Sequence, residues 1–242
     1  MTRELRGQVA FVTGGSRGIG LAIARALVAE GVHVGITGLN EERLASAREA
    51  LHGAGPAQVE TFNADVRQFD QVKQALGALT ARFGGLDIIV NNAAVGIFSS
   101  VADMTPEQWS EVITTNLTGA FHVTHAALPH LRERGGGSII NISSLAGTNA
   151  FTGGAAYCAS KAGLNAFSEV LMQEVRYDNI RVSYVMPGSV ATGFAGGDPE
   201  KGTDWKIAPE EVADVVMNLL HHDPRSLPSR VELRPSKPLR KS

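Results

Sequence analysis

The chain has 242 residues, 43% of them hydrophobic, which is enough for one large globular domain. Its 22 basic and 24 acidic residues are interspersed, and this argues against nucleic acid as a partner. With no apolar run near the ~18 residues of a membrane span, no apolar signal segment at the N-terminus and a single cysteine, Cys158, we expect a cytoplasmic protein without disulfides or membrane attachment.

Two kinds of hydrophobic pattern alternate along the chain. Strands are predicted at residues 8–13, 32–37, 58–63, 86–90, 138–142, 181–185 and 230–233. Helices are predicted at 21–30, 41–51, 68–83, 105–134, 153–174 and 209–220. Strands and helices that alternate at this spacing form right-handed βαβ units. The predicted fold is α/β, a doubly wound parallel sheet of about seven strands with helices on both faces, in a single domain over residues 1–242.

Unusual polar and glycine residues follow five of the predicted strands. They are the loop 14–20, Asp65, Asn91 with Asn92, Ser144, and Pro187 with Gly188. Ligands of parallel sheets bind at the carboxyl ends of the strands, where strand order reverses. Five loops of this kind rarely meet at one sheet edge by chance, so we expect a catalytic site there.

Gly14, Gly18 and Gly20 lie between a strand and a helix with the spacing of a dinucleotide-binding loop. Glycines allow a tight turn and let the backbone approach a pyrophosphate. The free N–H groups at the start of the following helix favour phosphate. The alternative is a glycine turn selected only for tight packing, and the flanking strand and helix favour the dinucleotide loop.

Tyr157 and Lys161 stand one turn apart on the same face of the helix predicted at 153–174. A free phenol has a pKa near ~10, and an ammonium a few ångströms away lowers it. Tyr157 could then exchange a proton with a substrate oxygen, while the hydroxyl of Ser144 holds that oxygen. An ordinary pair on a helix surface is the alternative, because this spacing alone is a weak signal.

Six motifs stand out along the chain: Thr13-Gly-Gly-Ser-Arg-Gly-Ile-Gly20, Asn91-Asn-Ala-Ala94, Asn116, Ser144, Tyr157-x3-Lys161 and Pro187-Gly188. Together they resemble the short-chain dehydrogenase/reductase family over roughly residues 5–192, and most closely its 3-oxoacyl-acyl-carrier-protein reductase-like branch. The resemblance implies that Tyr157 is the acid/base and that Lys161 holds the nicotinamide ribose and lowers the pKa of the tyrosine. It further implies that Ser144 orients the carbonyl and that Asn116 positions a water in a proton relay.

The resemblance also implies an oxidoreductase that moves a hydride between a nicotinamide cofactor and a carbonyl or secondary alcohol, with a 3-oxoacyl thioester as one candidate substrate. The implied cofactor contacts are Gly14, Ser16, Arg17, Gly18, Ile19, Gly20, Leu39, Asp65, Val66, Asn92, Ala93, Tyr157, Lys161, Pro187, Gly188, Val190 and Thr192. Departures from the family pattern at 177–179 and 230–235 leave the thioester open, whereas the departure at Ala94 narrows the groove slightly and adds no chemistry. A non-catalytic dinucleotide-binding sensor or scaffold is the alternative function.

The choice of cofactor depends on the end of the second strand. Sites that select NAD place a carboxylate there to accept from the ribose 2′-hydroxyl, whereas residues 37–40 contain none. Arg17 offers a cation toward a 2′-phosphate. Leu39 occupies the position where related NADP enzymes often carry a second arginine. We therefore predict that NADP(H) is favoured and that NAD(H) is still accepted.

Further expectations concern the surface and the pocket. Residues 193–207 are polar and glycine-rich, and we predict a lid that closes over substrate. The pocket is expected to take its shape from residues 95–99, 145–151 and 189–207. A homo-oligomer, a tetramer or a dimer, follows from the resemblance. We expect no metal site, because His122, His125 and His130 lack further converging ligands.

Overall fold

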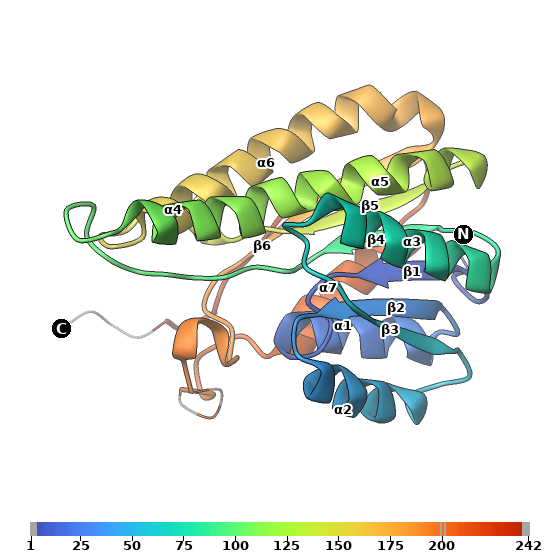
Figure 1. The fold of residues 1–242 in the computed structure, drawn as a ribbon, viewed down its shortest axis with the longest axis horizontal. Coiled ribbons are helices and arrows are strands. Elements are labelled where there is room, and N and C mark those ends of the chain that lie inside the picture. Colours follow the sequence, from blue (N-terminus) through green and yellow to red (C-terminus); the bar gives the residue numbers. More distant parts are fainter. Residues whose placement is uncertain (1–3, 199, 201, 239–242) are drawn as a thin grey trace.

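The computed structural model of the chain describes residues 4–198, 200 and 202–238. Within these residues, seven parallel strands form one sheet in the order β3-β2-β1-β4-β5-β6-β7 (Figure 1). The strands are β1 Val9–Val12, β2 His33–Gly38, β3 Val59–Asn63, β4 Ile88–Asn91, β5 Gly137–Ile142, β6 Ile180–Pro187 and β7 Arg230–Leu233. The strand order reverses between β1 and β4, which confirms the predicted doubly wound α/β fold.

Helices cover both faces of the sheet (Figure 1). One layer contains α1 Gly18–Ala29, α2 Glu41–His52 and α7 Pro209–His221, and the other contains α3 Phe69–Phe83, α5 Gly119–Glu133 and α6 Ala155–Val175. Side chains of β1 alternate between the two cores, with Ala10 and Val12 in the first and Val9 and Phe11 in the second. This two-residue period is the reason that a strand buried on both faces reads as a continuous hydrophobic run.

The prediction of one continuous helix at 105–134 is wrong in the middle of that range. The structure has α4 at Pro106–Ile113, a π-helical turn at Thr114–Thr118 and then α5. Asn116 lies inside the turn and is buried, with 1% of its surface exposed. A π turn changes the spacing of the backbone hydrogen bonds and not the hydrophobic pattern of the sequence, so that pattern could not predict it. Such turns occur frequently at functional sites.

A row of buried polar side chains joins the carboxyl ends of the central strands to the helices above them. Asn91 Nδ2 at the end of β4 donates to Asn141 Oδ1 on β5 at 2.8 Å and to Thr124 Oγ1 on α5 at 3.1 Å. Asn141 Nδ2 donates to Ser168 Oγ on α6 at 2.8 Å. These bonds hold α5 and α6 in register with the strands that lead into the site.

Among the described residues, no helix is both long enough and apolar enough to cross a membrane.

Candidate functional site

The glycine loop between β1 and α1 is packed against the loop that follows β4. Gly14 has a φ of +62°, and a Cβ there would lie 3.0 Å from Ala93 Cα. A Cβ on Gly20 would lie 2.4 Å from the Gly14 carbonyl oxygen. Asn92 Nδ2 bonds the carbonyl oxygens of Thr13 and Gly14 at 2.9 and 3.1 Å. Only glycine fits both positions, and the loop keeps its backbone open toward the start of α1.

A cavity of about 1450 Å³ extends along the carboxyl edge of the sheet. It is larger than the roughly 300–1,000 Å³ of a typical small-ligand pocket, which fits a site that takes two molecules. The predicted cofactor contacts that line it are Gly14, Ser16, Arg17, Gly18, Ile19, Leu39, Asp65, Val66, Asn92, Ala93, Tyr157, Lys161, Pro187, Gly188, Val190 and Thr192. Gly20 does not line the cavity, since it packs α1 against the loop below it.

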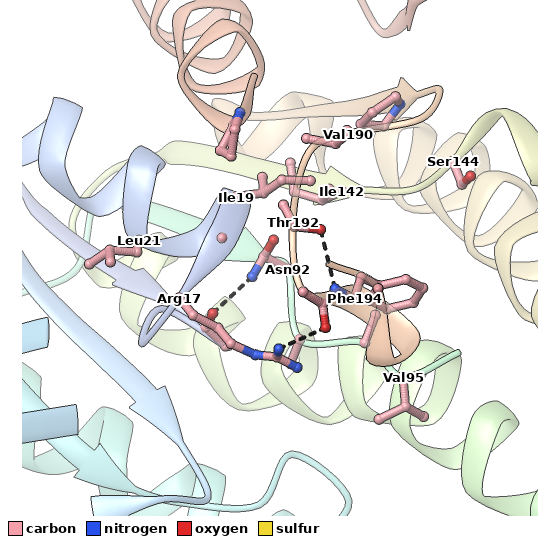
Figure 2. A pocket seen from close by; sticks show the side chains of 18 of the residues that line it. Arg17, Ile19, Leu21, Asn92, Val95, Ile142, Ser144, Val190, Thr192 and Phe194 are labelled. Carbon is pink, nitrogen blue, oxygen red and sulfur yellow. Dashed lines mark hydrogen bonds between the residues drawn. The ribbon is translucent and has the colours of Figure 1, made fainter. Parts of the chain in front are cut away.

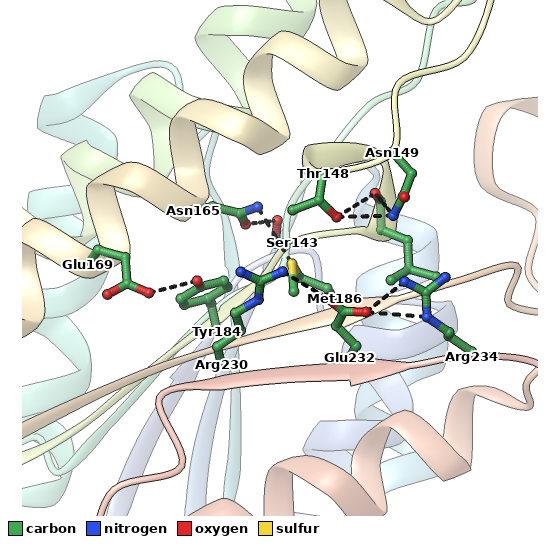
Figure 3. Close-up of polar contacts among 11 residues, drawn as sticks. Ser143, Thr148, Asn149, Asn165, Glu169, Tyr184, Met186, Arg230, Glu232 and Arg234 are labelled. Carbon is green, nitrogen blue, oxygen red and sulfur yellow. Dashed lines mark hydrogen bonds and ion pairs between the residues drawn. The ribbon is translucent and has the colours of Figure 1, made fainter.

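Ser144 and Tyr157 meet at the far end of the cavity from the glycine loop. Both side chains line the cavity, the Ser144 hydroxyl is near enough to influence the pKa of the Tyr157 phenol, and it accepts from the backbone N–H of Ala146 at 3.1 Å. The hydroxyl of Ser143 is directed to α6 instead, where it donates to Asn165 Oδ1 (Figure 3). Ser144, not Ser143, is therefore the hydroxyl beside the tyrosine.

Lys161 is buried on the same helix face as Tyr157, with 3% of its surface exposed. Its Nζ donates to the main-chain carbonyl oxygen of Ile142 at 2.9 Å and lies 5.8 Å from the centroid of the Tyr157 ring. Burial lowers the pKa of Lys161 to about 8. The ammonium is still mostly protonated at neutral pH and places a positive charge in a region of low dielectric.

The expected lowering of the Tyr157 pKa is not seen in this structure. Burial raises the pKa of the phenol above its usual value, and the Ser144 hydroxyl opposes that shift only in part. The physical reason is that the Lys161 ammonium bonds Ile142 rather than the tyrosine hydroxyl, so the loss of hydration outweighs the charge.

Asn116 lies beneath the cavity rather than on its wall. Its Oδ1 accepts from the Val95 N–H at 2.8 Å, and its Nδ2 donates to Val95 O at 3.0 Å and Ser160 Oγ at 3.1 Å. A second cavity of about 10 Å³, close to the space one water needs, is lined by Asn116, Lys161 and Asn91, among others. The buried Asn91 Oδ1 has no hydrogen-bond partner.

Arginines surround the other end of the large cavity. Arg17 Nη1 donates to the carbonyl oxygen of Gly193 at 3.0 Å (Figure 2). Arg43, on the first turn of α2, also lines the cavity, and its guanidinium has no partner among the described residues. Sequence reasoning missed Arg43. The signal was available, since the residue lies four positions after Leu39, but the face of α2 that it occupies depends on how the helix packs.

Asp65 lines the cavity with its carboxylate already paired. Arg67 bonds both carboxylate oxygens, at 2.8 and 3.0 Å from Nε and 2.6 Å from Nη2. Partial burial works in the opposite direction, but these bonds hold the pKa of Asp65 below its usual value. The Asp65 carboxylate is therefore ionised, and the Arg67 guanidinium balances its negative charge.

Comparison with known proteins gives the family. The short chain dehydrogenase family matches residues 8–201. An acetoacetyl-CoA reductase of Rhizobium meliloti is 38% identical over 89% of this chain and 92% of its own length. A 3-oxoacyl-[acyl-carrier-protein] reductase of Chlamydia muridarum is 38% identical over 81% of this chain and 79% of its own. A metagenomic short-chain oxidoreductase solved in complex with NADP is 38% identical, with a TM-score of 0.85, over 97% of this chain and 100% of its own.

The chain is a short-chain dehydrogenase/reductase. Membership confirms the resemblance seen in the sequence, including the 3-oxoacyl-acyl-carrier-protein reductase-like branch. It makes the protein an NAD(P)-dependent oxidoreductase and favours an enzyme over a non-catalytic sensor. The glycine cradle, the α1 N-terminus and the lining arginines fit a nicotinamide dinucleotide.

The dehydrogenase also carries site residues that sequence reasoning did not single out. Phe98, Phe151 and Phe194 line the cavity around Tyr157. They come from the three segments that were expected to shape the pocket, but the contacts of Phe98 and Phe194 with Tyr157, and of Phe151 with Phe98, depend on tertiary structure. Two histidines of α5 have a packing role: His122 Nδ1 hydrogen-bonds Val66 O at 3.0 Å, and both His122 and His125 contact the ring of Phe69.

Proposed function

We propose that this dehydrogenase is an NADP(H)-preferring oxidoreductase for a carbonyl and secondary alcohol pair, with Tyr157 as the acid/base. The observation that carries the proposal is the meeting of Ser144, Tyr157 and Lys161 at one end of the cavity whose other end is the glycine loop. A bound nicotinamide would supply the hydride for reduction and take it in oxidation. The other steps fall to side chains of this chain.

Two hydroxyls would hold the substrate oxygen. Because the Ser144 hydroxyl and the Tyr157 phenol lie near each other on the cavity wall, a carbonyl oxygen placed between them could accept from both. Ser144 would stabilise the negative charge that develops on the oxygen. In reduction, Tyr157 would donate its phenolic proton to that oxygen, and in oxidation it would take the proton back.

We assign Lys161 two roles, holding the ribose of the cofactor and favouring the phenolate form of Tyr157. Its buried ammonium, 5.8 Å from the tyrosine ring centroid, supports the electrostatic role. The raised pKa of Tyr157 makes this role necessary, because burial by itself disfavours the phenolate.

Asn116 would hold a water that passes the proton on from Lys161. The water-sized cavity bounded by Asn116, Lys161 and Asn91 supports this role. The orphaned Asn91 Oδ1 supplies an acceptor for such a water, and a buried acceptor without a partner is costly unless water satisfies it.

The preference for NADP(H) over NAD(H) is supported by the charges around the adenine end of the cavity. Residues 37–40 contain no carboxylate, and Leu39 is 64% exposed. Arg17 and Arg43 line the same region, and an arginine binds phosphate through several donors at once. A relative of 38% identity was solved with NADP.

The substrate is a small molecule with a carbonyl or secondary hydroxyl group. The names of two relatives make a 3-oxoacyl thioester one candidate.

Two further proposals are carried over from the sequence. The first is that residues 193–207 act as a lid. The second is that the protein forms a dimer or tetramer through the outer faces of α5 and α6, where Phe121 and Val170 are 47% and 53% exposed.

The test is a turnover assay with purified protein. NADPH and NADH are each supplied with a panel of ketones, aldehydes and acetoacetyl-CoA, and oxidation of the cofactor is followed at its nicotinamide absorbance band. We expect turnover with at least one carbonyl, faster with NADPH, and its loss in Tyr157→Phe. Turnover in Tyr157→Phe equal to that of the wild type would remove the assigned mechanism.

A further inference from the structure

Three phenylalanine rings from three separate loops form a cluster beside the proposed acid/base. Phe98 follows β4 and Phe151 precedes α6. Phe194 follows β6 (Figure 2). The centroids of Phe98 and Phe194 each lie 5.6 Å from that of Tyr157, the first edge-on at 80° and the second tilted at 52°. Phe98 and Phe151 lie 5.7 Å apart. These are the separations at which aromatic rings attract each other.

Two glycines provide the space in which these rings sit. A Cβ on Gly96 would lie 2.6 Å from Phe194 Cε1 and 3.2 Å from Phe98 Cζ, and a Cβ on Gly154 would lie 2.6 Å from Phe151 Cε2. Each ring therefore packs directly on backbone. A parallel bridge between Ser99 and Gly154 ties the first two loops together. The rings thus form a built wall of the cavity and are not loose surface side chains.

The wall exposes its apolar surface to the cavity. Phe98 and Phe151 are each 48% exposed although both pack on other rings. Apolar area that remains open in a cavity favours a ligand that covers it. A flat aromatic ring can cover this area and at the same time make edge-to-face or offset-stacked contacts with the three phenylalanines.

The segments that carry the rings contain no cation. Residues 95–104 include only Asp103 as a charged residue, residues 145–154 include none and residues 189–198 include only Asp198. The cations that line the rest of the cavity are Arg17, Arg25, Arg43, Arg67, Lys161, Lys206 and Arg234. Arg17 reaches the carbonyl oxygen of Gly193, beside Phe194, but the segments of Phe98 and Phe151 offer no positive charge to a phosphate-bearing thioester or an acidic carrier protein, whereas an uncharged ring would meet apolar surface there.

We infer that the substrate of this dehydrogenase is an aryl ketone, or the matching aryl secondary alcohol in the reverse direction. Its ring lies among Phe98, Phe151 and Phe194, and its oxygen lies between Ser144 and Tyr157. The inference rests on the proposed carbonyl/alcohol function and adds the chemical class of the substrate.

The experiment compares two ketones of similar size that differ in planarity. The kcat/KM of acetophenone and of cyclohexyl methyl ketone is measured with NADPH for the wild type, Phe98→Leu, Phe151→Leu and a matched control, Trp109→Leu. Trp109 is half-exposed like the other two but lies on α4, outside the cavity. Leucine keeps an apolar side chain and removes only the ring.

We expect the wild type to prefer acetophenone. Each of Phe98→Leu and Phe151→Leu should lower kcat/KM for acetophenone about two- to twelvefold, the range that an aromatic pair is worth, and should change the cyclohexyl ketone less. Trp109→Leu should change neither. Equal losses of kcat/KM for both ketones would overturn the inference. A wild type that prefers acetoacetyl-CoA, together with leucine variants whose kcat/KM is unchanged, would overturn it as well. Either outcome leaves the proposed function standing.

A binding measurement separates the inference of an aryl substrate from the proposed carbonyl/alcohol function. Calorimetric titration of the NADPH-loaded protein with 1-phenylethanol and with 1-cyclohexylethanol reports ring preference without turnover, because the reduced cofactor cannot accept a hydride from an alcohol. Tighter binding of the phenyl alcohol that is lost in Phe98→Leu supports the aryl substrate even where no carbonyl is turned over, in which case only the proposed function fails. Equal binding of the two alcohols contradicts the aryl substrate.

Discussion

The Lys161 ammonium donates to the Ile142 carbonyl oxygen at 2.9 Å and lies 5.8 Å from the centroid of the Tyr157 ring. A buried cation held by one neutral acceptor is poorly solvated, and burial accordingly lowers the pKa of Lys161 from 10.5 to about 8. The same side chain is needed for catalysis in our proposal. Lys161 is thus a position where function and stability are in conflict.

This conflict predicts an unusual stability profile. Below pH 8 the folded and unfolded chains both carry the proton on Lys161, and folding bears the full cost of burying the charge. Between about pH 8 and 10.5 only the unfolded chain keeps the proton, so the contribution of this group to stability rises with pH. Lys161→Met should therefore raise the free energy of unfolding at pH 7, by up to about 3 kcal/mol, while turnover falls.

Urea denaturation of the wild type and Lys161→Met at pH 7 and at about pH 9.5 checks this prediction. The difference between the two proteins should shrink at the higher pH, because the wild-type lysine is then largely neutral in the folded state. A variant less stable than the wild type at pH 7 would mean that the ammonium has partners that stabilise it.

Tyr157→Phe should reduce kcat by about 10²- to 10⁴-fold, the usual contribution of a positioned acid/base. The phenylalanine keeps the ring and its contacts with Phe98 and Phe194, so the dissociation constant of NADPH should change little. Tyr177→Phe is the control, since Tyr177 is 90% exposed and does not line the cavity. Stopped-flow turnover and a fluorescence titration of NADPH give the two quantities.

Arg43→Ala should weaken NADPH binding about 10- to 150-fold, the value of one charge-assisted hydrogen bond, and leave NADH binding unchanged. Arg48→Ala on the same helix is the control, because Arg48 does not line the cavity. Arg17→Ala should act in the same direction. A wild type that binds NADH as tightly as NADPH would end the cofactor assignment.

The lid prediction concerns Trp205, which lines the cavity from the loop 193–207. Arg17 is bonded to Gly193 at the base of this loop, so a 2′-phosphate that engages Arg17 should release one of the contacts holding the loop. In a Trp109→Phe background, which leaves Trp205 as the only tryptophan, its emission should change when NADP binds and again when substrate binds. Emission that ignores both would count against a lid.

The assembly prediction is that the protein sediments at two or four times the 25.5 kDa of one chain. Val170→Glu should shift it toward the monomer, because a carboxylate cannot be buried unpaired in an apolar interface. Glu174→Gln, on the same helix, is a control that adds no charge. A wild type that sediments as a single chain at micromolar concentration would contradict the prediction.

Much of the fold could be read from local pattern. The alternation of β and α elements, the seven strands and the glycine loop are encoded in short stretches whose hydrophobic period and turn residues specify them. The predicted ends of the strands and helices were less accurate. Strand β6 continues to Pro187 because Met186 and Pro187 pair with Glu232 and Leu233, residues about 46 positions away in the sequence.

The sequence by itself determined which residue types stand at the end of each strand, and therefore the family, the cofactor class and the candidate residues Ser144, Tyr157 and Lys161. Three features were decided only by tertiary structure. The π turn sets the Asn116 side chain against the Val95 backbone, the raised pKa of Tyr157 depends on burial, and the aromatic wall depends on three loops meeting. Each results from contacts between residues distant in the chain, and such contacts leave no period in the sequence from which they could be read.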